Sequence, residues 1–102
     1  MKMDKMLKQV QKIQAQMTLA EEALADEIVE GTSGGGMVTV KANGRGEVVS
    51  VSISRDVVDP NDVEMLEDLV LSAVKEAVRL SHELAERRLG SLTGKMGIPG
   101  MF

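Results

Sequence analysis

Residues 37–54, MVTVKANGRGEVVSVSIS, decide the fold of this chain. Apolar and polar side chains alternate through residues 37–43 and again through residues 47–54, as they do in strands with one buried face. The tetrapeptide Asn-Gly-Arg-Gly at 43–46 separates the two stretches, and an Asn-Gly pair in this position is a strong hairpin signal. The segment therefore predicts an antiparallel hairpin with one face in solvent.

A long amphipathic helix is predicted before the hairpin, over residues 3–27. Its apolar residues recur at alternating steps of three and four, which is the spacing of a heptad seam. The seam consists of Met3, Met6, Val10, Ile13, Met17, Ala20 and Leu24. Between this helix and the hairpin lie residues 28–33, IVEGTS, and three consecutive glycines. The pattern alone leaves open whether residues 28–33 form a third strand.

A second long helix is predicted after the hairpin, over residues 60–90. Asp59 is suited to cap it, Pro60 fits the first helical position, and Gly90 is a natural stop. Its apolar set at helical spacing is Val63, Leu66, Leu69, Val70, Ala73, Val74, Ala77, Leu80 and Leu84. Residues 91–102 are rich in glycine, and we expect them to form a flexible tail.

Length and composition exclude several protein classes. The chain has 102 residues, a formal charge of −4, no cysteine, one histidine and one aromatic residue, Phe102. This is the size of a single domain, so residues 1–102 are predicted to form one. Without cysteine there is no disulfide framework and no thiolate nucleophile. No apolar run is long enough for a membrane span and no signal peptide begins the sequence, so we expect the cytoplasm.

Several short motifs resemble enzyme or metal signatures but lack required members. The glycines at 44 and 46 are followed by Val49 where a dinucleotide-binding loop needs a third glycine. Residues 90–95 have three residues between the glycines where a phosphate loop needs four. His82 precedes Glu83, but the helix has no second histidine to complete a zinc site. We therefore predict no enzyme activity, no metal and no cofactor.

The predicted helix lengths favour a homodimer. The two helices would span ~38 and ~46 Å, whereas a compact domain of this length is roughly 30–35 Å across. A small sheet can cover only part of the apolar faces of two such helices. A second copy of the chain would cover the remainder. The alternative is that the two helices fold against each other within one chain.

Charge is distributed unevenly along the first helix. Lys2, Lys5, Lys8 and Lys12 lie within a ~120° arc, and residues 13–30 contain five acidic side chains and no basic one. Cations at a helix N-terminus oppose the helix dipole, so stability alone does not favour this arrangement. A basic ridge of this kind is suited to phosphates. The alternative is an ordinary solvated face. Arg87 and Arg88 form a second basic pair near the end of the second helix.

Four blocks of the chain resemble the YbaB/EbfC family of bacterial nucleoid-associated proteins. They are KMLKQVQKIQAQM, EGTSGGGMVTVKANGRGEVVSVSI, DPNDVEMLEDLVLSAVKEA and LGSLTGKMGIPGMF, in this order. The resemblance implies an α+β fold of order α-β-β-β-α, with residues 28–33 as the first strand, and a tweezer-like homodimer with projecting helices. It also implies binding of double-stranded DNA with low sequence preference, and roles in nucleoid organisation and gene regulation.

The matching basic positions, and hence the implied DNA-binding residues, are Lys2, Lys5, Lys8, Lys12, Arg87 and Arg88. A different class of function stays open, namely an interaction module for a recombination or replication protein. It would use the acidic residues Glu64, Glu67 and Asp68 and adaptable contacts from the eight methionines. The alternative for the methionines is that they fill gaps in a core without aromatic residues.

Overall fold

The computed structural model describes residues 2–95 of the chain and consists of two long helices around three strands. The elements are α1 (Lys2–Asp26), β1 (Ile28–Ser33), β2 (Val38–Asn43), β3 (Val48–Ile53) and α2 (Val63–Lys95), with 3-10 turns at Gly34–Gly36 and Arg55–Val57. The strands form one antiparallel sheet in the order β1-β2-β3. The predicted α+β class and α-β-β-β-α order are confirmed, including the strand at 28–33 that the residue pattern left open.

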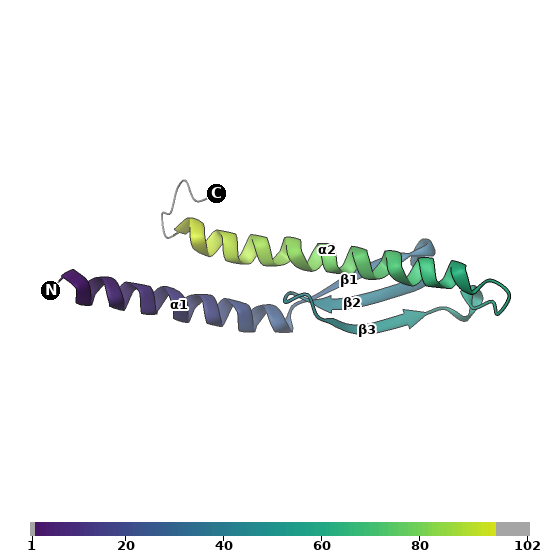
Figure 1. Ribbon diagram of the computed structural model, residues 1–102, viewed down its shortest axis with the longest axis horizontal. Coiled ribbons are helices and arrows are strands. Elements are labelled where there is room, and N and C mark those ends of the chain that lie inside the picture. The colour runs from purple at the N-terminus through teal and green to yellow at the C-terminus, as the bar shows by residue number, and fades with distance from the viewer. Residues whose placement is uncertain (1, 96–102) are drawn as a thin grey trace.

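The molecule is long and thin, with extents of 72 × 24 × 16 Å. Its radius of gyration is 19.4 Å, against ~13 Å for a compact domain of about 100 residues. In Figure 1, α2 runs over one face of the sheet and continues past it, while α1 leaves the sheet in the same direction as a separate helix. Within one chain, the inner end of α1 meets α2 near Glu27 and Arg88, and the outer part of α1 is exposed.

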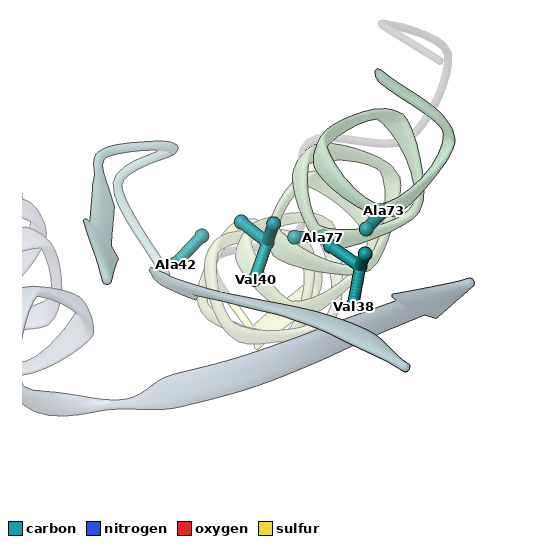
Figure 2. Close-up of a cluster of buried hydrophobic side chains, with 5 residues drawn as sticks. All are labelled: Val38, Val40, Ala42, Ala73 and Ala77. Carbon is teal, nitrogen blue, oxygen red and sulfur yellow. The ribbon is translucent and has the colours of Figure 1, made fainter. Parts of the chain in front are cut away.

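The core lies between β2 and the first half of α2, and it is small. Figure 2 shows its buried members, with the β2 side chains pointing towards the two alanines of α2. They are Val38, Val40, Ala42, Ala73 and Ala77, all fully shielded from solvent. The small side chains on α2 allow β1 to approach the helix backbone. A Cβ added at Gly31 would collide with the amide nitrogen of Ala77 and the carbonyl oxygen of Ala73.

β3 is the least covered strand. In its pairing with β2, Val51 lies opposite Val40 and Ile53 lies opposite Val38, so these side chains are on the face that α2 covers. They nevertheless stay 47% and 40% exposed. The hairpin was predicted to have one solvated face and one buried face. Within one chain, the apolar face of its second strand is still open.

The predicted helix boundaries need correction. α2 begins at Val63 and not at residue 60. Residues 59–62 form a turn in which the Asp62 amide donates to the Asp59 carbonyl oxygen at 3.0 Å. Asp62 is then the capping residue, because its Oδ1 accepts from the amide of Met65 at 3.2 Å.

The other end of α2 also differs from the prediction. The helix passes through Gly90 and continues to Lys95, because a glycine inside a helix costs only about 1 kcal/mol. The first five residues of the predicted tail, 91–95, therefore belong to α2, and the remainder of that prediction lies outside the described residues. α1 was predicted over residues 3–27, and its bounds are shifted by one residue.

Candidate nucleic-acid interface

The N-terminal part of α1, residues 2–17, projects from the molecule and is called the arm below. The side chains of Lys5, Lys8 and Lys12 are exposed along it, and Lys2 lies in its first turn. Asp4 is the acidic residue of that turn, and the last turn of α1 contains no basic residue. Each cation in the first turn of an exposed helix costs about 0.3 kcal/mol or more. The helix dipole therefore does not favour Lys2 and Lys5 at this end of α1.

The apolar seam of α1 packs at its inner end, where the helix meets the sheet. Leu24 is buried at 3% exposure, and Ile13 and Met17 are half-buried. Exposure then rises outward, from 50% at Val10 to 64% at Met6 and 77% at Met3. The outer seam of α1 therefore lies open beside the lysines.

The two arginines have different surroundings. Arg87 is exposed. Arg88 forms a two-point ion pair with Glu27, with 2.7 Å between Nη2 and Oε1 and 3.3 Å between Nε and Oε2. Hydrogen bonding to Glu27, together with its negative charge, raises the pKa of Arg88. Since Glu27 follows the end of α1, this pair lies about 33 Å along the helix from Lys5. The structure does not bring the arginines and the lysines into one site.

Other charged residues of α2 form a local network on its surface. Arg79 lies 2.7 Å from Glu76 and 2.6 Å from Glu83. The hydrogen bond from Arg79 lowers the pKa of Glu76. His82 is exposed. Among the residues that the structure describes, no three His, Asp or Glu side chains are grouped as metal ligands would be.

Comparison with known proteins decides the family. Residues 1–96 match the YbaB/EbfC DNA-binding family. The chain belongs to this family. It is 49% identical to a nucleoid-associated protein of Pelotomaculum thermopropionicum over 100 residues, covering 98% of this chain and 95% of that protein. A nucleoid-associated protein of Chloroflexus aurantiacus is 52% identical over 97 residues, covering 95% of each.

A solved structure has the same fold. The crystal structure of an uncharacterized protein from Helicobacter pylori superposes with a TM-score of 0.76 at 26% identity. The match covers 95% of this chain and 99% of that one. The resemblance to the YbaB/EbfC family that the four sequence blocks indicated is therefore confirmed.

This YbaB/EbfC family member also has an apolar groove that sequence reasoning missed. The groove lies between β3 and the outer side of α2 and is lined by Ile53, Leu66, Glu67, Val70, Leu71 and Val74. Leu71 is 52% exposed and was not part of the predicted apolar set. The sequence did contain a signal for this groove. The apolar set predicted on the second helix covers a wider arc of that helix than one small sheet can bury.

The helices within residues 2–95 include none whose length and apolar character would allow it to cross a membrane. Two exposed surfaces are candidates for binding, namely the arm and the groove. One is basic and lies at the projecting end, and the other is apolar and lies beside the sheet.

Proposed function

We propose that this protein binds double-stranded DNA with little sequence preference, through contacts between the arm lysines and phosphates. The observation that carries the proposal is the exposed row of Lys5, Lys8 and Lys12 on a projecting helix, of which Lys5 lies in a first turn where the helix dipole disfavours cations. Membership of a DNA-binding family supports the same reading. Lys2 would extend the row, and Arg87 and Arg88 stay predicted phosphate ligands.

The chemistry of the chain favours phosphate contacts over base reading. Sequence is read in the major groove by well-placed side chains that pair with base edges, and bases in single strands stack on aromatic rings. The only aromatic residue of the sequence is Phe102. The formal charge of −4 requires the acidic parts to face away from the duplex. Affinity should therefore be modest and strongly dependent on salt.

A homodimer completes the proposal, with the apolar groove covered by a second copy. The chain's own core has only five fully buried hydrophobic residues within its main cluster, while Val48, Val49 and Val51 of β3 are each about half exposed. An edge strand with an open apolar face is a surface that proteins normally cover. Two copies joined here would present two arms, which is the tweezer-like arrangement.

The relatives named above are nucleoid-associated proteins. By this similarity we propose that the chain acts on the nucleoid in the cytoplasm, in its organisation and in gene regulation. The proposal assigns the protein a binding role and no enzymatic one.

The salt dependence of binding tests the proposal. Fluorescence anisotropy of a labelled duplex of about 30 base pairs would be measured at several salt concentrations. Each neutralised phosphate contributes about −0.9 to the slope of log affinity against log salt. Two engaged arms predict a slope between about −4 and −7. No binding at about 50 mM salt would contradict the proposal.

A second candidate function is docking of a basic protein partner, such as a recombination or replication factor. Glu64, Glu67 and Asp68 are all exposed near the start of α2, and an open depression there is lined by Asp62, Glu64, Met65, Asp68, Leu69 and Ser72. This surface is unsuited to phosphates. Affinity purification after DNA digestion should recover a stoichiometric partner if this candidate is right, and none if it is wrong.

A further inference from the structure

The inner end of α1 is anchored in a small socket. The carbonyl oxygen of Leu24 accepts a hydrogen bond from the amide of Gly44 at 2.8 Å, in the turn between β2 and β3. A Cβ added at Gly44 would lie 2.8 Å from the backbone carbonyl oxygen of Leu24, so glycine is the residue that allows this approach. The socket holds one turn of the helix. If this socket alone held α1, the helix could tilt about it, and this point is called the pivot below.

A second attachment lies just beyond the pivot. The carboxylate of Glu27 meets the guanidinium of Arg88 on α2 at two points, joining residues 61 positions apart in the sequence. Two-point pairs of this kind fix orientation as well as distance. Glu27 and Arg88 also line a small depression between the helices together with Gln16, Ala20, Ala23 and Leu24. From this depression towards its N-terminus, α1 is increasingly exposed.

The arm is long compared with the part of α1 that contacts the rest of the molecule. Lys5 lies about 29 Å from the pivot along the helix, so a tilt of about 10° would move it by about 5 Å. Phosphates of one DNA strand follow one another at about 3.4 Å along the duplex axis. A small change of angle at the base therefore changes which phosphates the lysines can reach.

We propose that the Glu27–Arg88 ion pair is a brace that sets the angle of the arm, and that Arg88 is a positioning residue for DNA binding. This inference rests on the proposed function. It differs from the assignment of Arg88 as a phosphate ligand. The pair is partly exposed, with 59% of the Arg88 side chain and 35% of the Glu27 side chain accessible, so the brace is weak and its loss should have a graded effect.

The variant Glu27→Ala separates the two roles of Arg88 by the sign of its effect. If Arg88 binds phosphate, removing its carboxylate partner frees the guanidinium and strengthens DNA binding. If the pair is a brace, the same change weakens binding by about two- to fivefold. The matched control is Glu22→Ala. It removes the same charge from an exposed position of α1 at which no ion pair occurs among the described residues.

A distance measurement tests the brace without DNA. The chain has no cysteine, so Gln9→Cys on the arm and Lys75→Cys on α2 would carry spin labels, with unlabelled chains in excess. We expect Glu27→Ala to broaden the distance distribution, and the exchanged pair Glu27→Arg with Arg88→Glu to narrow it again and recover affinity. An unchanged distribution, or tighter DNA binding by Glu27→Ala than by Glu22→Ala, overturns the inference. If the unaltered protein binds no DNA, the proposed function fails, and the distances still decide whether the brace exists.

Discussion

α1 and α2 share an amphipathic pattern but differ in what their apolar stripes contact. The first half of α2 lies on the sheet, and Ala73 and Ala77 are fully buried there. Within residues 2–95, the outer half of α1 is mostly exposed, and Met3 and Met6 are more than 60% exposed. Periodicity thus predicts that a helix has an apolar face, but it does not tell which part of that face is covered. In this molecule the covered helix builds the fold, and we propose that the uncovered one carries the function.

The same substitution in the two helices should separate these roles most strongly. Ala77→Leu adds three carbons at a position without free space, where the backbone of α2 meets β1. We expect it to lower the free energy of unfolding by about 3 kcal/mol or to prevent folding. Ala15→Leu, at an exposed position of α1, should change that energy by less than about 0.5 kcal/mol. Urea unfolding followed by circular dichroism measures both. Equal losses would show that the arm is packed in solution.

A second pair of matched variants tests whether two copies of the chain associate through the groove. Leu71 of the groove and Leu7 of the arm are similarly exposed, at 52% and 57%. If a second copy covers the groove, Leu71→Asp buries an unpaired charge in the interface and should turn the dimer into a monomer. Leu7→Asp should leave the dimer intact. Light scattering with refractive-index detection gives the masses, because the chain has no Trp or Tyr. A monomeric unaltered protein, or an intact Leu71→Asp dimer, would contradict the proposed interface.

Much of the fold was predictable because its signals are local. Alternation and a turn tetrapeptide define the hairpin, and three- and four-residue steps define both helices. The helix boundaries were less certain, since Asp59 and Asp62 are both suitable caps and only the turn at 59–62 decides between them. Gly90 is a stop signal that a stable helix overrides.

The candidate site was predictable only in part. The lysines follow from charge along one helix, which a sequence displays directly. The Glu27–Arg88 pair and the contact between Leu24 and Gly44 depend on the tertiary arrangement, and neither has a local signature. The groove was missed for a related reason. Val51 belongs to an ordinary strand pattern and Leu71 lies outside the predicted apolar set, and the groove between them is apparent only once the sheet and α2 are placed together.

Two variants of equal charge test whether the arm lysines bind DNA. Lys5, Lys8 and Lys12 would be changed to Glu in one variant. Arg45, Arg55 and Lys75, which are exposed elsewhere in the molecule, would be changed to Glu in the other. Affinity for the same duplex would be measured by anisotropy at fixed salt, with circular dichroism to confirm folding. We expect the arm variant to lose about 100-fold or more in affinity and the control far less. Equal losses, or an arm variant that binds like the unaltered protein, would contradict the account.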